Sequence, residues 1–267
     1  MYAFDYHRPQ SLDEAKLLLE KSEDPKILAG GHTLLPTMKQ RLAMPTDLID
    51  IGRLQELRGI EVSSNTAIIG ACETNAAIAG SDAIKSRIPG LATLASKIGD
   101  PHVRHMGTIG GSVANNDPAA DYPAACLGLE ATIHTTERAI SANNFFGELF
   151  ETALNDAEVI TKIEFQIPEK SAYAKFPSPA SRYAVVGIFV AQGTNGVRVA
   201  MTGAAPSVRR LTKLEDALSQ SFSPDSIANL KIDADGLNGD IHASSEYRAH
   251  LAIVMAKRAV AAANEAC

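Results

Sequence analysis

Two glycine pairs, each set among small and polar residues, constrain this chain more than any other feature. The first lies in Ala29-Gly30-Gly31-His32-Thr33, and the second lies in Thr108-Ile109-Gly110-Gly111-Ser112. Glycine lets the backbone approach a ligand with no Cβ in the way. Each pair also precedes a predicted helix start, where free N–H groups and the helix dipole attract anions. Two such loops in one chain favour an elongated ligand with two phosphates, such as a dinucleotide.

The first glycine loop matches neither of the common phosphate-binding fingerprints. No Gly-Lys-Ser/Thr sequence follows it, so it is not a Walker loop, and it lacks the third glycine of the Rossmann motif. The alternative interpretation of the first loop is a plain strand-to-helix turn. The presence of a second, similar loop makes this alternative less favoured. His32 could act as a base, but a histidine packed beside the ligand is favoured, and we predict no catalytic residue in this chain.

Composition and charge exclude several classes of partner. The chain has 267 residues, a net charge of −6 and no basic run, which argues against nucleic acid or an anionic membrane as a partner. No apolar run is long enough for a membrane span. The first residues lack the basic and apolar regions of a signal peptide, so a cytoplasmic protein is expected.

The cysteines limit the kind of redox centre that the chain can hold. Cys72, Cys126 and Cys267 are scattered, which is not a disulfide framework. Three thiols also cannot supply the usual four ligands of an iron–sulfur cluster. Any redox centre bound within this chain is therefore expected to be organic.

Turn signals and hydrophobic periodicity divide the chain into three units, residues 1–53, 54–168 and 169–267. In the first unit we expect a helix behind Ser11, a strand at 26–29, a helix from 33 or 34 to 42 and a strand at 47–51. In the second we expect a hairpin of 60–62 with 67–70, helices at 89–98 and 122–127, and a strand at 159–165. In the third we expect a boundary or exposed loop at 170–179, strands at 185–191 and 196–201, and a long helix from Ser244-Ser245.

Several polar residues allow both a structural and a functional interpretation. Asp117 and Asp121 suit a helix start, but either carboxylate could accept hydrogen bonds from sugar hydroxyls. His102 and His105, with Asp100 and Cys126, weakly suggest zinc. They lack a second ligand pair at the usual spacing, so no metal site is predicted. Lys175 alone would be interpreted as a solvated strand residue.

The combination of these motifs resembles the FAD-binding medium subunit of the molybdenum hydroxylases, as in aerobic carbon monoxide dehydrogenases, and the flavin domain of xanthine dehydrogenase. The features occur in family order along essentially the whole chain. They are the Ala-Gly-Gly-His-Thr loop, the Thr-Ile-Gly-Gly loop, the Pro-Ala-Ala-Asp run, Phe145-Phe146-Gly147 and the strand that ends at Pro168.

The resemblance implies an α+β fold. It consists of a vanillyl-alcohol-oxidase-type (PCMH-type) FAD-binding fold in two subdomains, 1–53 and 54–168, and a C-terminal α+β domain, 169–267. By family pattern the FAD pyrophosphate lies against Leu28, Ala29, Gly30, Gly31, His32 and Thr33. Thr108, Gly111 and Ser112 would line the other side. Asp121 matches the acidic FAD ligand, Ile160 an apolar residue against the flavin, and Lys175 a lysine near the ring system.

The chain departs from the family pattern at three places. Ser112 stands where the family often has Asn, and His102 and His105 stand where it usually has Gln and Asn. The stretch from 134 to 144 is short for the family.

The function that the resemblance implies is electron transfer. FAD would receive electrons from 2Fe-2S clusters on a small subunit, which are supplied by a molybdenum-cofactor site on a large subunit. It would pass them to an external acceptor such as NAD, a quinone or oxygen. The resemblance also implies a dimer of heterotrimers. A stand-alone FAD-dependent oxidoreductase on the same fold and a non-catalytic assembly subunit are the alternatives.

Overall fold

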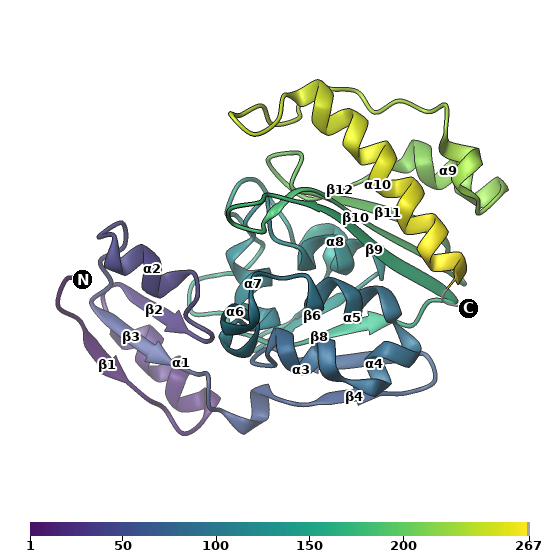
Figure 1. The fold of residues 1–267 in the computed structure, drawn as a ribbon. Helices are drawn as coiled ribbons and strands as arrows, with labels where there is room; N and C mark the ends of the chain where they lie inside the picture. The colour runs from purple at the N-terminus through teal and green to yellow at the C-terminus, as the bar shows by residue number, and fades with distance from the viewer. Residues whose placement is uncertain (266–267) are drawn as a thin grey trace.

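Three β-sheets form the framework of the protein in the computed structural model, which describes residues 1–265 (Figure 1). Cys267 lies outside the described residues. One sheet lies within each of the segments 1–53, 54–168 and 169–267. The mixture of sheets and helices is the expected α+β class. The division into domains at residues 53 and 168 stays a prediction.

The N-terminal sheet is parallel and positions the first glycine loop. Its strand order is β1-β3-β2, with bounds β1 Asp5–His7, β2 Pro25–Leu28 and β3 Asp47–Asp50. Helix α1 (Leu12–Lys21) begins where predicted, because the Ser11 side chain accepts a hydrogen bond from the Glu14 N–H. Helix α2 (Leu34–Lys39) follows the glycine loop and ends earlier than expected.

The middle sheet is antiparallel, in the order β4-β5-β8-β6-β7. Its strands are β4 Ile60–Val62, β5 Thr66–Gly70, β6 Thr132–Thr135, β7 Ala139–Ser141 and β8 Ile160–Gln166. The predicted β4–β5 hairpin and the strand before Pro168 are confirmed. The tight β6–β7 hairpin lies within residues 132–141.

Six helices connect the strands of the middle sheet. They are α3 Asn75–Gly80, α4 Asp82–Arg87, α5 Pro89–Ser96, α6 Pro101–Met106, α7 Ile109–Asn115 and α8 Tyr122–Gly128. Short 3-10 turns at Gln55–Leu57 and Ala142–Asn144 complete this segment. Every residue of α8 is buried, because the helix packs between the middle and C-terminal sheets.

The C-terminal sheet is antiparallel, in the order β12-β11-β10-β9, and helices cover both of its faces (Figure 1). Its strands are β9 Lys170–Pro177, β10 Ala184–Gly193, β11 Gly196–Thr202 and β12 Arg209–Arg210. Helices α9 (Thr212–Gln220) and α10 (Ser245–Glu265) pack on one face, while α8 packs on the other. A 3-10 turn spans Pro224–Ile227.

The expected exposed loop at 170–179 is wrong. Residues 170–177 form β9, in which Ser171, Ala172, Tyr173 and Ala174 are buried. The Ser and Pro content is typical of a loop, but helices on both faces of the sheet exclude water from this strand. None of the helices in residues 1–265 is both long and apolar enough to cross a bilayer.

Candidate cofactor cleft

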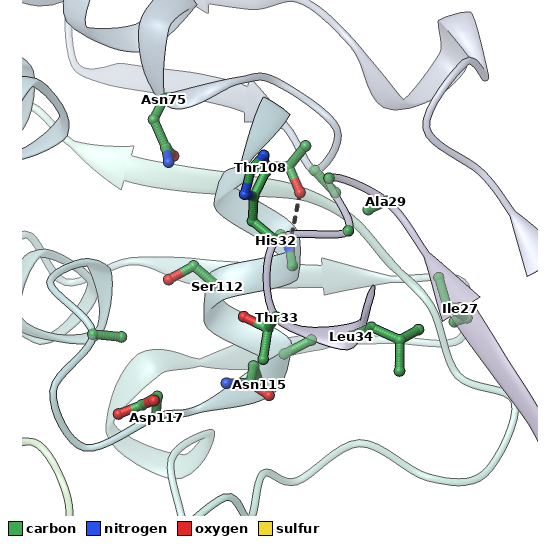
Figure 2. Close-up of a pocket in the computed structure, with 18 of the residues that line it drawn as sticks. Ile27, Ala29, His32, Thr33, Leu34, Asn75, Thr108, Ser112, Asn115 and Asp117 are labelled. Atoms are coloured by element: carbon green, nitrogen blue, oxygen red, sulfur yellow. Dashed lines mark hydrogen bonds between the residues drawn. The ribbon is translucent and has the colours of Figure 1, made fainter. Parts of the chain in front are cut away.

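A cleft of about 650 Å³ lies where all three segments of the chain meet. The β2–α2 loop and the start of α7 line it. So do the segment before β8 and the β9–β10 turn, which includes Tyr183. Figure 2 shows part of this wall, with His32 and Thr33 from the first glycine loop beside Thr108 and Ser112. The volume suits an organic ligand, since most such pockets measure about 300–1,000 Å³.

Twelve of the thirteen residues predicted to bind a cofactor line this one cleft; the exception is Lys175. They are Leu28, Ala29, Gly30, Gly31, His32, Thr33, Thr108, Gly111, Ser112, Asp117, Asp121 and Ile160. The exposed His102 and His105, on α6, are not among the lining residues. The departure from the family pattern at those two positions therefore lies outside the wall of the cleft.

The first glycine loop has the close approach and the backbone geometry that its sequence predicts. A Cβ on Gly30 would lie 2.3 Å from the Met106 carbonyl oxygen, so the loop packs directly on the backbone before α7. Gly31 has a φ of +72°, which disfavours other residues. Within the described chain, the backbone N–H groups of residues 30–34 donate no hydrogen bond. Five free donors in succession suit a ligand rich in acceptors.

The second glycine pair differs from its prediction. It lies in the first turn of α7, whose N-cap is Thr108, and not in a loop before the helix at 122. The Thr108 Oγ1 accepts from the Gly111 N–H at 3.3 Å (Figure 2). A Cβ on Gly110 would lie 2.6 Å from the Ala71 Cβ, so this glycine serves helix packing. Both glycines line the cleft, but Gly110 is buried and Gly111 is exposed.

The two aspartates do not cap the helix that follows them. Asp117 Oδ1 accepts from the Ala119 N–H at 2.8 Å, which closes a tight turn after the left-handed Asn116. Asp121 occupies the N-cap position of α8 but has helical backbone angles, and its side chain makes no capping bond. The helix-cap interpretation of Asp121 is therefore wrong.

Asp121 instead belongs to a buried charge cluster. Its side chain is 5% exposed, and that of Lys175 is 3% exposed. Lys175 Nζ lies 3.0 Å from Asp121 Oδ2 and donates to the Lys97 carbonyl oxygen at 2.9 Å. The Tyr173 hydroxyl donates to Asp121 Oδ1. Because Tyr173 and Lys175 are two residues apart on β9, both side chains leave the strand on the same face.

Burial governs the ionisation of this cluster. It raises the pKa of the Asp121 carboxyl, and the Lys175 ammonium opposes that rise. It also lowers the pKa of Lys97, with a further contribution from the Lys175 charge. The aspartate–lysine pair therefore joins α8 to β9 through charges that water barely reaches. Lys175 does not line the cleft, but it contacts Asp121, which does.

A second ion pair holds the segment before β8, where Glu158 lines the cleft. Arg138 donates to both Glu158 oxygens at 3.1 Å, and Thr135 Oγ1 and the Asn155 N–H donate at 2.6 and 2.8 Å. The Glu158 side chain is fully buried. The hydrogen bond from Arg138 is the largest cause that lowers the pKa of Glu158 to about 2.

We expect acid to weaken this segment of the protein over a defined range. A carboxyl whose pKa falls from 4.5 to about 2 on folding stabilises the protein fully above pH 4.5. That contribution is lost as the pH falls toward 2. The measurement is the urea midpoint between pH 6 and pH 2.5 for the wild type and Glu158→Gln. The difference between the two proteins should shrink with falling pH; a difference independent of pH would contradict this assignment.

The residues of the weak zinc hypothesis do not converge. Cys126 is buried inside α8, and burial raises the pKa of its thiol. Asp100 Oδ1 caps α6 by accepting from the Val103 N–H, and His105 Nδ1 donates to the Pro101 carbonyl oxygen. Among residues 1–265, no three His, Cys, Asp or Glu side chains are grouped so that they could hold a metal ion.

Sequence reasoning missed several lining residues, among them Cys72, Asn75 and Tyr183. Cys72 and Asn75 follow β5, and Tyr183 lies in the turn between β9 and β10. No motif distinguishes these three positions. Tyr173, which donates to Asp121, was also missed. The alternation in Tyr173-Ala174-Lys175 puts it on the same strand face as Lys175, and this was the one available signal.

Comparison with known proteins shows the family of the chain. A family model described as the FAD-binding domain in molybdopterin dehydrogenase matches residues 2–169. The carbon monoxide dehydrogenase medium chain of Hydrogenophaga pseudoflava is 35% identical over 283 residues, which cover 99% of this chain and 98% of that one. The glyceraldehyde dehydrogenase medium chain of Sulfolobus acidocaldarius is 32% identical, with 92% and 90% covered.

A solved structure matches the whole fold. It is carbon monoxide dehydrogenase from Hydrogenophaga pseudoflava, in a form that lacks the Mo-pyranopterin moiety of the molybdenum cofactor. The matching chain has a TM-score of 0.88 at 35% identity, over 100% of this chain and 99% of that chain.

Proposed function

The chain belongs to the family of FAD-binding domains of molybdopterin dehydrogenases, and from this premise we propose how its cleft holds FAD and how the subunit assembles. It is the FAD-binding electron-transfer subunit of a molybdenum-containing hydroxylase or dehydrogenase, with the α+β fold of the medium subunits. Bound FAD supplies the redox chemistry and carries electrons from iron–sulfur clusters on a partner chain to an external acceptor. The family match carries this assignment, because residues 2–169 include both glycine loops.

We propose that the FAD pyrophosphate lies between the first glycine loop and the start of α7. The free N–H groups of residues 30–34 suit phosphate oxygens. The close packing of Gly30 on the backbone at 106–107 supports this placement, because it brings the two loops together in one wall. Thr33, Thr108 and Ser112 supply hydroxyl groups on the same wall. Leu28 and Ala29 directly precede this loop and line the cleft beside it.

We propose that the far end of the cleft holds a sugar or ring of FAD against Asp121 and Ile160. Asp121 accepts from Tyr173 and Lys175, but each carboxylate oxygen has two acceptor sites. A ligand hydroxyl can therefore join without displacing either partner. Asp117 also lines the cleft, and its Oδ1 already accepts from the Ala119 N–H. Ile160 is 4% exposed and offers an apolar surface.

We expect one FAD per chain, held without a covalent bond. His32 is exposed in its loop. Burial raises the pKa of the Cys72 thiol in the cleft to about 12, so this thiol is protonated and unreactive at neutral pH. Acid precipitation should leave all flavin absorbance in the supernatant. A yellow pellet, with flavin mass on a tryptic peptide that contains His32 or Cys72, would overturn the expectation. Purified protein with no flavin capacity would argue for the non-catalytic assembly subunit.

The partners follow from the family. Its members are medium subunits of multi-subunit enzymes, which implies a large and a small partner chain. We propose that the large chain carries the molybdenum cofactor, that the small one carries 2Fe-2S clusters, and that two heterotrimers pair in the cytoplasm. Affinity purification of the tagged chain from its own cells should recover both partners, and light scattering should give the mass of six chains. Rapid oxidation of a small organic substrate by the isolated chain would favour the stand-alone oxidoreductase.

A further inference from the structure

One buried side-chain polar atom in the wall of the cleft has no hydrogen-bond partner within residues 1–265. It is Oδ1 of Asn75, which is buried and accepts no hydrogen bond. The residue is 3% exposed, begins α3 and lines the cleft. Figure 2 shows its carboxamide projecting on the side of the cleft where Thr108 and Ser112 lie. Buried polar atoms are nearly always paired, so an orphaned acceptor facing a cleft indicates a donor on a ligand.

The backbone around Asn75 fixes where its side chain can point. Its N–H donates to the Gly107 carbonyl oxygen at 2.9 Å, and Thr74 pairs with Thr108 across an isolated bridge. A Cβ on Gly107 would lie 3.0 Å from Asn75 Nδ2, so the amide packs against this residue. Asn75 is therefore held beside the segment that leads into α7, although 33 residues of sequence separate it from Thr108.

We propose that Asn75 is a further FAD-binding residue, whose Oδ1 accepts a hydrogen bond from a hydroxyl or N–H group of the cofactor. The inference rests on the proposed FAD site and adds a side chain that belongs to neither glycine loop. At neutral pH the pyrophosphate offers acceptors only. The donors of FAD are its ribityl and ribose hydroxyls and the N–H groups of its two ring systems, so Asn75 contacts one of these.

The decisive variant is Asn75→Leu, which keeps the approximate shape and removes the acceptor. The Kd for FAD, measured by calorimetry on the full-length apo-protein, should rise about tenfold, the effect of one lost hydrogen bond. The melting temperature of the apo-protein should stay level or rise, because an unpaired buried oxygen is gone. Wild-type affinity in Asn75→Leu would overturn the proposal. If Asn75→Leu does not fold, the same comparison with Asn75→Ala decides it.

Thr74→Val is the matched control at the neighbouring position. Thr74 Oγ1 accepts from the Ala77 N–H at 3.2 Å and caps α3, but the residue does not line the cleft. This variant should lower the melting temperature and leave the Kd for FAD unchanged, the reverse of Asn75→Leu. The same pattern in both variants, a lower melting temperature with unchanged affinity, would mean that Asn75 is only structural and would overturn the proposal.

Two fragments of the cofactor identify the donor. FMN carries the ring system and the ribityl chain, while ADP carries adenine, ribose and both phosphates. Weaker binding of FMN to Asn75→Leu assigns the donor to the flavin half, and weaker binding of ADP assigns it to the adenosine half. Unchanged affinity for both fragments and for FAD would overturn the proposal. A wild-type chain that binds no FAD would instead overturn the proposed function.

Discussion

Gly30→Val is expected to abolish FAD binding while leaving the fold intact. The new Cβ would lie 2.3 Å from the Met106 carbonyl oxygen and 2.8 Å from the Gly107 Cα. These are backbone atoms, so relief requires the first glycine loop to move away from the segment before α7. Moving the loop takes its N–H groups away from the pyrophosphate, and losing two hydrogen bonds to that charged group costs about 3 kcal/mol or more, which corresponds to at least ~100-fold in Kd. The flavin-to-protein absorbance ratio after purification measures the loss.

Two further variants separate loop geometry from the mere addition of a side chain. Gly31→Val should also lose flavin, because its φ of +72° is unfavourable for a β-branched residue. Gly80→Ala is the matched control, since a Cβ there meets nothing within 4 Å. It should bind FAD as the wild type does. A folded Gly30→Val protein with normal flavin content would refute the placement of the pyrophosphate at this loop.

The sequence predicts most of the first segment because its signals are local. Ser11 caps α1, the glycine pair separates β2 from α2, and each element is short enough for its own pattern to define it. The same holds for the β4–β5 hairpin, where three turn residues separate two short strands. In these places the backbone conformation depends on residues only a few positions apart.

The sequence alone misassigns residues whose surroundings come from distant segments. The strand β9 contains Ser and Pro, yet its middle is buried because α5 from the middle segment and α10 from the end of the chain pack against it. Gly110 has the sequence of a ligand-binding loop, but its missing Cβ accommodates Ala71, some 40 residues earlier. Such contacts leave no periodic pattern.

The residues of the candidate site also divide into those that local motifs predict and those that depend on distant contacts. Its glycine loops are contiguous motifs, so the family resemblance assigns them directly. The acceptor role of Asn75 and the partners of Asp121 depend on which atoms the fold leaves paired or unpaired. Lys175 lies 54 residues from Asp121, and only the packing of β9 against α8 brings the two charges together.

Breaking the Asp121–Lys175 pair from either side is expected to destabilise the protein strongly. Both side chains are at least 95% buried, so removing one charge leaves the other unpaired in a poorly solvated place. Such single changes cost about 3–5 kcal/mol of unfolding free energy. Asp121→Asn and Lys175→Met should each show this loss in urea unfolding. Asn still offers an oxygen to the Tyr173 hydroxyl, so the variant tests the charge.

The double variant Asp121→Asn/Lys175→Met should recover most of that loss, because neither charge remains buried alone. It also makes the cofactor role of Asp121 measurable in a stable protein. If the carboxylate accepts from an FAD hydroxyl, the double variant should bind FAD more weakly by about 1.5–3 kcal/mol, the worth of a hydrogen bond to a charged group. Wild-type affinity would mean that the pair only joins α8 to β9. Additive losses in the double variant would instead show that the two charges do not stabilise each other.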